Sequence, residues 1–167
     1  EIENITPEDY SVQLITDNAI SLNDGIQIIT RFTGTPDEIH DNFDFEHCKN
    51  YYDYYNDKLV LNPNALESII TKTLYYNGSK YPLCSLFRLR KFLKRGWNIT
   101  AGEMLKIGYD INELNFENID VLKEHLTGVD FSSFQYVISQ LNKDIETDNF
   151  KNYLFEIIDD VFYDYED

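Results

Sequence analysis

The sequence predicts an α+β fold in which antiparallel hairpins come first and a bundle of helices follows. Apolar and polar residues alternate in several short segments before residue 62, as they do in half-buried strands. An Asn23-Asp24-Gly25 turn separates two of these segments. From Asn64 onward the apolar residues recur every three or four positions, which is typical of amphipathic helices. We therefore expect a strand-rich region over residues 1–62 and a helical region over residues 63–167.

The first strands are predicted near the N-terminus. Residues 11–16 alternate and predict one strand. Residues 19–22 and 26–30 predict a hairpin, because the Asp24-Gly25 pair between them suits a tight turn with positive φ. Together these segments predict a small antiparallel sheet.

A short helix and two further strand segments complete the first region. Thr35-Pro36-Asp37-Glu38 offers a capping side chain, a proline at the first helical position and early acids, so a helix should begin there. Residues 43–48 alternate and predict a strand. Residues 51–61 predict a second hairpin that turns around Asn56-Asp57.

The helical region begins with a stripe of apolar residues after Asn64. Ala65, Ile69, Ile70 and Leu74 share one helical face, and Gly78 is the expected stop. Further helices are predicted at residues 82–95, 100–109, 118–126, 130–143 and 149–163. The last of these is acidic and amphipathic, so we expect it to dock through its apolar side.

The overall composition bounds the class of protein. The chain has 167 residues, of which 43% are apolar and 15% aromatic, so it can form a core and is not intrinsically disordered. Its 30 acids and 14 bases give a net charge of −16, which argues against coating duplex DNA or an anionic membrane. The two cysteines are too few for a disulfide scaffold, and no signal peptide or run of 18 apolar residues is found. We expect a soluble cytoplasmic protein.

Half of the bases lie in one short stretch. Seven of the fourteen fall between Lys80 and Lys106, where Glu103 is the only acid. On a helical wheel the apolar arc is formed by Leu86, Leu89, Phe92 and Leu93, and the bases occupy the opposite half: Arg88, Arg90, Lys91, Lys94 and Arg95. This face either pairs with the many carboxylates of the chain or binds phosphate, which guanidinium groups match in a bidentate way.

Other clusters of reactive side chains are weaker. Four residues of the types that bind metals lie close together in sequence: His40, Asp44, Glu46 and His47. On a strand, Asp44 and Glu46 would lie on one face and His47 on the other, so no metal site is predicted. A thiol nucleophile at Cys48 beside His47 has the same difficulty. The tyrosines of residues 51–55 could stack bases or could simply build a twisted hairpin.

Two motifs in order carry a resemblance to a known family. Asp44-Phe45-Glu46-His47-Cys48 is followed, starting 41 positions later, by Ser85-Leu86-Phe87-Arg88-Leu89-Arg90-Lys91-Phe92-Leu93-Lys94-Arg95-Gly96-Trp97-Asn98-Ile99, with Lys72-Thr73-Leu74 between them. This order resembles the rear part of class II tRNA nucleotidyltransferases and poly(A) polymerases, namely the late palm strands and the first helical region. The chain also resembles a protein family found in tailed phages, through Gly78-Ser79-Lys80-Tyr81-Pro82-Leu83 and Leu126-Thr127-Gly128-Val129-Asp130.

The resemblance implies a partial palm-like sheet and a nucleotide site. It implies Mg²⁺ with ATP or CTP, or an RNA or DNA end, as ligands, and it places Asp44 near the base or the metals. The residues that would bind phosphate are Lys80, Arg88, Arg90, Lys91, Lys94 and Arg95. The chain departs from the family because it has no glycine turn followed by Asp-x-Asp, the pair that holds the metals. An active enzyme would need that half outside this chain.

Two functions follow as hypotheses. The first is a phage-type module, resembling a nucleotidyltransferase, that binds a nucleoside triphosphate or a nucleic-acid end. The alternative is a catalytically inert acidic protein that mimics nucleic acid and inhibits a host or antiviral nucleoprotein through that partner's cationic surface. In either case a phage-encoded chain would act in the host cytoplasm.

Overall fold

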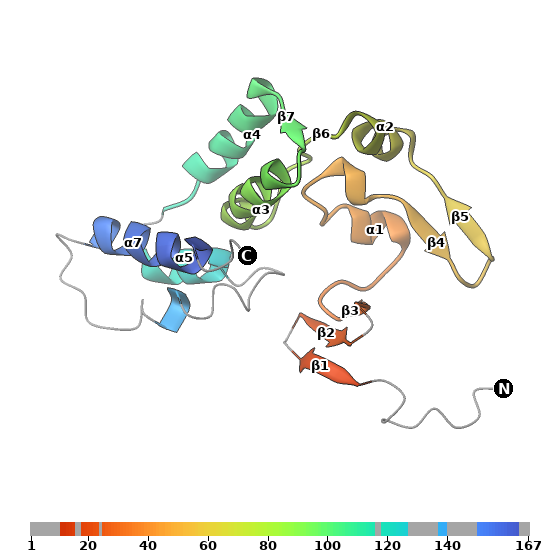
Figure 1. Ribbon diagram of the computed structural model, residues 1–167, viewed down its shortest axis with the longest axis horizontal. Coiled ribbons are helices and arrows are strands. Elements are labelled where there is room, and N and C mark those ends of the chain that lie inside the picture. Colours follow the sequence, from red (N-terminus) through yellow and green to blue (C-terminus); the bar gives the residue numbers. More distant parts are fainter. Residues whose placement is uncertain are drawn as a thin grey trace. The chain divides into compact units, whose positions relative to one another are not determined.

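The computed structural model describes residues 11–15, 18–23, 25–115, 118–126, 137–139 and 150–163 (Figure 1). Short antiparallel hairpins precede a series of helices, so the predicted α+β class is confirmed. The contacts divide the chain into two compact units, Gly34–Leu126 and the combination of Glu1–Thr33 with Thr127–Asp167. The domain boundary predicted between residues 62 and 63 falls inside Gly34–Leu126 and stays a prediction.

The unit that holds the N-terminus contains a three-stranded antiparallel sheet. Strands β1 (Val12–Ile15), β2 (Ala19–Leu22) and β3 (Gln27–Ile29) are paired in that order. The sequence predicts the three strands and the hairpin between the last two. Gly25 has a φ of 75°, which explains why a glycine follows Asp24 at the turn. The predicted hairpin is therefore confirmed, since β2 and β3 pair in antiparallel fashion on either side of this turn.

The same unit contains the acidic C-terminal helix α7 (Phe150–Tyr163). Leu154 and Ile157 are buried, while Glu156, Asp159 and Asp160 are exposed, which confirms the predicted amphipathic helix. The helix predicted at 130–143 lies mostly outside the described residues, of which 137–139 are helical. None of the helices in the described ranges is long and apolar enough to cross a bilayer.

The unit Gly34–Leu126 begins with helix α1 (Pro36–His40). Thr35 and Glu38 form the capping box that the sequence predicts, with Thr35 accepting from the Glu38 N–H and the Glu38 carboxylate accepting from the Thr35 N–H. The second predicted hairpin is also present, as strands β4 (Tyr51–Asp53) and β5 (Lys58–Val60). Asp57 takes a φ of 48° at its turn.

The strand predicted over residues 43–48 is wrong. Only Phe45 forms a bridge, to Tyr76, and the chain then turns into a 3₁₀ helix, η1 (Glu46–Cys48). The turn arises because the Cys48 N–H bonds back to the Phe45 carbonyl instead of to a neighbouring strand. The buried Phe45 ring satisfies the apolar pattern without a regular strand.

The helix after Asn64 also ends earlier than predicted. Helix α2 (Pro63–Thr71) stops at Lys72, which adopts a left-handed conformation with φ 50°, and not at Gly78. Thr73–Leu74 then form strand β6, which pairs in parallel with β7 (Asn98–Ile99). Leu74 is fully buried as a strand residue, so its apolar character does not mark a helical face.

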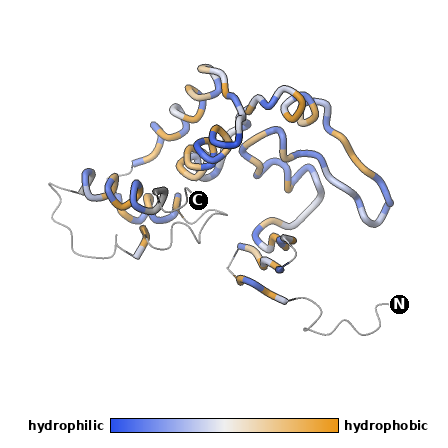
Figure 2. The backbone as a smooth tube through the Cα atoms, in the orientation of Figure 1, coloured by the Kyte–Doolittle hydropathy of each residue, from blue (hydrophilic) through white to orange (hydrophobic). Residues whose placement is uncertain are grey.

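Three further helices follow as predicted: α3 (Pro82–Lys94), α4 (Ala101–Asn112) and α5 (Ile119–Leu126). Helix α3 contacts both α4 and α5. The core of the unit is built from Phe45, Leu74, Tyr76, Leu89 and Ile107. Figure 2 shows apolar residues recurring along the helices.

Candidate functional site

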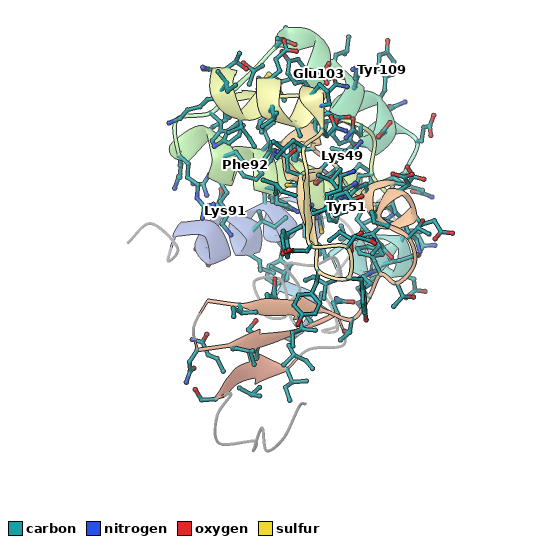
Figure 3. All side chains as sticks on the ribbon, turned by 90° about the vertical axis from the view of Figure 1, so that its right-hand side faces the viewer. Lys49, Tyr51, Lys91, Phe92, Glu103 and Tyr109 are labelled. Atoms are coloured by element: carbon teal, nitrogen blue, oxygen red, sulfur yellow. The ribbon has the colours of Figure 1, made fainter. Side chains whose placement is uncertain are left out.

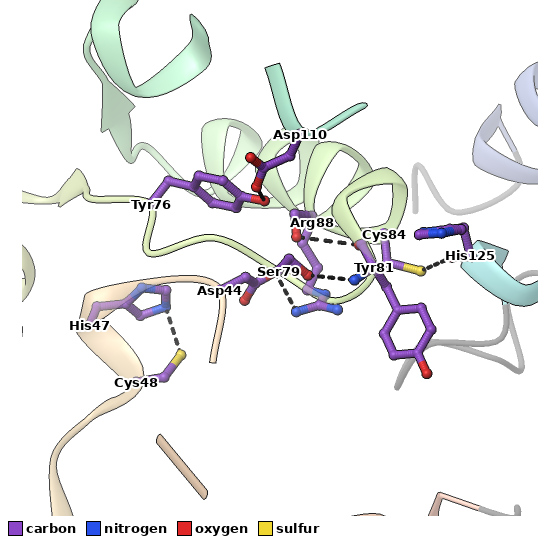
Figure 4. A network of polar contacts seen from close by, with 11 residues as sticks. Asp44, His47, Cys48, Tyr76, Ser79, Tyr81, Cys84, Arg88, Asp110 and His125 are labelled. Carbon is purple, nitrogen blue, oxygen red and sulfur yellow. Dashed lines mark hydrogen bonds and ion pairs between the residues drawn. The ribbon is translucent and has the colours of Figure 1, made fainter. Parts of the chain in front are cut away.

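The predicted site residues centre on α3 and on Asp44, which the fold brings together. The Glu46 N–H bonds to the Tyr75 carbonyl and the Asn77 N–H bonds to the Asp44 carbonyl. This pairing carries Asp44 to the side of α3, where Arg88 Nη1 donates to Asp44 Oδ2 at 2.5 Å (Figure 4). The Asp44 residue is only 5% exposed and the Arg88 side chain 23% exposed. These two residues therefore form a largely buried ion pair.

The helical wheel predicts the inner face of α3 only in part. Leu89 is buried and Phe92 packs against the core, as predicted. Leu86 and Leu93 are each more than 40% exposed, and Ser85 is buried instead. Arg88 lies beside that buried face and not on the outer half of the helix. The pattern misleads because a buried carboxylate on another segment, Asp44, provides a partner for an inward arginine.

The other predicted cations remain at the surface of α3. Arg90, Lys91, Lys94 and Arg95 are exposed. Figure 3 labels Lys91 next to the half-buried Phe92. Lys80 precedes the helix, and its Nζ lies 5.4 Å from the centroid of the Tyr81 ring. The structure thus keeps four of the six predicted phosphate ligands on one exposed stretch of helix.

A second polar cluster, which the sequence patterns do not indicate, surrounds Tyr76. The Tyr76 hydroxyl donates to Asp110 Oδ2 at 2.7 Å, and the Tyr76 N–H donates to Glu103 Oε2 at 2.7 Å. Lys106 pairs with the other oxygen of Glu103. Burial and the Asp110 carboxylate raise the pKa of Tyr76, so its hydroxyl stays protonated and serves as a donor. The cluster ties β6 and the residues after it to α4.

His47 and Cys48 lie close enough to interact, contrary to the geometry expected of neighbours on a strand. Cys48 Sγ is 3.3 Å from His47 Nε2 within the 3₁₀ turn. Desolvation and the nearby Asp44 charge raise the pKa of Cys48 to about 11, and desolvation lowers the pKa of His47. A thiol with this pKa is protonated at neutral pH, so the pair does not provide an activated nucleophile.

The described residues do not form a site for the magnesium ions that the nucleotidyltransferase resemblance implies. In the described part of the chain, no three His, Cys, Asp or Glu side chains gather so that they could hold a metal ion. The carboxylate of Asp44 already receives Arg88. We therefore derive no metal-dependent step for this chain.

The negative charge is concentrated in one of the two units. Glu1–Thr33 and Thr127–Asp167 together carry 16 of the 30 acids and 3 of the 14 bases, a net charge of −13. Gly34–Leu126 carries the other 14 acids and 11 bases, a net charge of −3, and includes all the cations of α3. One unit is thus strongly anionic, whereas the other is close to balanced.

Comparison with known proteins relates the N-terminal part of the chain to phage proteins. Residues 2–72 match the model of a family described as Gabija anti-defense 2 family protein. Among curated proteins, the chain is 23% identical over 100 residues to "Gabija anti-defense 2" of Bacillus phage SPbetaL7. That alignment covers 59% of this chain and 25% of the relative, so the chain spans about a quarter of the relative's length.

The comparisons give no support to the hypothesis that this chain binds a nucleotide. No solved structure matches the chain. The family match ends at residue 72, before the cationic helix α3 begins at Pro82. Neither match is to a nucleotidyltransferase, and that resemblance stays a hypothesis.

Proposed function

We propose that this chain is a phage protein that counters the Gabija defence of its host by binding a cationic surface of a defence protein. The similarity to a phage protein named Gabija anti-defense 2 supports an action against this defence. Binding to a cationic surface is supported by one observation, the charge of the anionic unit, which has 16 acids and 3 bases. Surfaces that bind nucleic acid present Lys and Arg to phosphates, and an array of carboxylates competes for the same groups.

The mode of action is inhibition by contact, without chemistry performed by this chain. Exposed carboxylates of α7, at Glu156, Asp159 and Asp160, take the place of backbone phosphates. Attraction between such surfaces acts over about 10 Å at moderate salt and is screened at high salt. The chain would act in the host cytoplasm.

The test is a plating assay joined to a binding assay. Bacteria that carry the Gabija system are challenged with a sensitive phage while they express the chain, and we expect plating to be restored. Binding to the purified Gabija proteins should be detectable at 50 mM salt and should weaken about 100-fold or more at 500 mM salt. A chain that neither binds nor restores plating would refute the proposal.

Matched charge variants test where the attraction arises. Glu156→Gln, Asp159→Asn and Asp160→Asn together remove three exposed acids from the anionic unit. The control, Glu67→Gln with Glu113→Gln and Asp120→Asn, removes three exposed acids from the other unit. The α7 variant should weaken binding and lower its salt dependence more than the control variant does. Equal effects would contradict the proposal that the attraction arises in the anionic unit.

Binding of a phosphate-bearing ligand by α3 is the second candidate function. It is favoured by the exposure of Arg90, Lys91, Lys94 and Arg95 on one helix. Titration calorimetry with ATP and with CTP, each with and without Mg²⁺, should detect affinity tighter than about 1 mM. Lys91→Gln with Arg95→Gln should abolish it, and Lys58→Gln on β5 is the control. No binding by the unaltered chain would remove this candidate.

A further inference from the structure

The hairpin formed by β4 and β5 presents an unusual amount of aromatic surface. Tyr54 is 83% exposed and Tyr55 is 97% exposed at its turn. On the strands, Tyr52 lies opposite Leu59 and both are exposed. Large side chains gathered at one exposed place are typical of interaction sites, whereas single exposed apolar residues are ordinary. The hairpin also lies inside the segment that matches the phage family.

The turn is held in a defined conformation by its own side chains. The Asn56 N–H and Nδ2 donate to the two carboxylate oxygens of Asp53, at 3.1 Å and 2.6 Å. These bonds lower the pKa of Asp53 and keep it ionised. The Tyr52 hydroxyl donates to the Asp57 carboxylate. A turn fixed in this way loses less conformational entropy when a partner binds.

The surroundings of the turn are acidic. Asp53 and Asp57 belong to the hairpin, and Lys58 is its only base. Helix α1 lies beside β4, because the His40 ring is 5.3 Å from the Tyr51 ring. At that end of the hairpin, which is the end away from the turn, the helix and its C-terminal cap add the exposed acids Asp37 and Asp41. At the turn itself, Asp53 and Asp57 flank the two exposed tyrosines.

Tyrosine rings beside carboxylates are suited to arginine. A guanidinium group stacks on an aromatic face and forms bidentate hydrogen bonds with a carboxylate. Tyrosine and arginine are also among the residues most enriched at the energetic hot spots of protein interfaces. A nucleic-acid strand could stack on the same rings, but its phosphates would be repelled by the acids nearby.

We infer that the turn of this hairpin, with Tyr54 and Tyr55 as its anchors and Asp53 and Asp57 beside them, docks on an arginine-bearing surface of the defence protein. This inference rests on the function proposed above and names the surface that makes the contact. The anionic unit supplies attraction over distance, whereas the hairpin supplies the close contacts that keep the complex together.

The experiment removes the two rings from the full chain. Tyr54→Ser with Tyr55→Ser should weaken binding to the purified Gabija proteins by about 30-fold or more, the loss typical of an interface anchor. Tyr54→Phe with Tyr55→Phe should stay within about threefold, because the stacking face remains. Tyr109→Ser, at a tyrosine on α4 that is 65% exposed, is the matched control and should have little effect. Thermal unfolding of each variant checks that the fold is unchanged.

The outcomes separate this inference from the proposed function. If the unaltered chain binds and the Ser variant binds equally well, the hairpin is not the anchor and the inhibitory function stands. If the unaltered chain does not bind at all, both proposals fail. If the unaltered chain instead binds a labelled single-stranded oligonucleotide and the Ser variant does not, the rings stack on bases and the inference is overturned.

Discussion

Arg88 belongs to the interior although it stands in a run of surface cations. Its partner Asp44 is almost wholly buried, and the two atoms of the ion pair are 2.5 Å apart. When one member of a buried pair is removed, the other remains as an uncompensated charge in a poorly solvated place. The pair is therefore a structural contact between α3 and the segment before η1.

Replacement of Arg88 by methionine should lower the free energy of unfolding by about 3 kcal/mol, as measured by urea denaturation. The loss should shrink in the double variant Asp44→Asn with Arg88→Met, because the buried charge is then gone as well. Lys91→Met, at an exposed position of the same helix, should change stability by less than about 0.5 kcal/mol. Equal losses at Arg88 and Lys91 would contradict a structural pair.

His47 makes stability depend on pH in a defined direction. Burial lowers its pKa below the ordinary value, with only partial opposition from Asp44. As the pH falls below about 6.5, the unfolded chain takes up a proton that the folded chain does not accept until lower pH, so the folded state loses stability.

We expect His47→Phe to lose less stability than the unaltered protein between pH 7.5 and pH 5.5. Phenylalanine retains ring packing against Phe92 and Trp97, whose centroids each lie 4.6 Å from that of His47. Urea denaturation at the two pH values gives the comparison. An identical drop for both proteins would show that His47 does not contribute.

At the scale of elements, the start of α2 depends on Asn62. Its side-chain oxygen accepts hydrogen bonds from the N–H groups of Asn64 and Ala65, at 2.9 Å and 3.2 Å. Asn62→Ala should therefore cost about 1 kcal/mol, seen as a lower Tm. Asn62→Asp retains the cap and should come close to the unaltered protein. If Asn64→Ala, which removes no cap, is equally destabilising, the capping role is wrong.

Elements with local signals could be predicted from the sequence. The Asp24-Gly25 turn, the Thr35–Glu38 capping box and the later helices each carry their cause within a few residues. Where the prediction fails, the cause is a distant partner. Leu74 becomes a strand residue because it pairs with Ile99 of β7, 25 positions later, and Phe45 forms a bridge to Tyr76.

The candidate site, like the fold, could be predicted from the sequence only where its signals are local. The exposed cations of α3 follow from composition and helical spacing. The pairing of Arg88 with Asp44 spans 44 positions, and that of Tyr76 with Asp110 spans 34. Neither pair belongs to a spacing rule of a helix or a strand, so only the folded chain brings them together.

At the scale of the whole molecule, charge repulsion opposes folding. The net charge is −16, and −13 of it belongs to one unit. Salt screens exposed like charges much more than the buried Arg88 pair. We expect the free energy of unfolding to increase between 20 mM and 300 mM NaCl, as measured by urea denaturation. A decrease over this range would mean that attractive surface pairs outweigh the repulsion.

The two cysteines differ in exposure, and this difference can be used to measure how often the fold opens. Cys48 is exposed, whereas Cys84 is fully buried between α3 and α5, where its thiol donates to the His125 carbonyl. A thiol reagent in excess, at an alkaline pH that offsets the raised pKa of Cys48, can modify the first without disturbing the packing of these helices. The rate at which the second becomes modified then reports how often α3 and α5 separate, without any added probe.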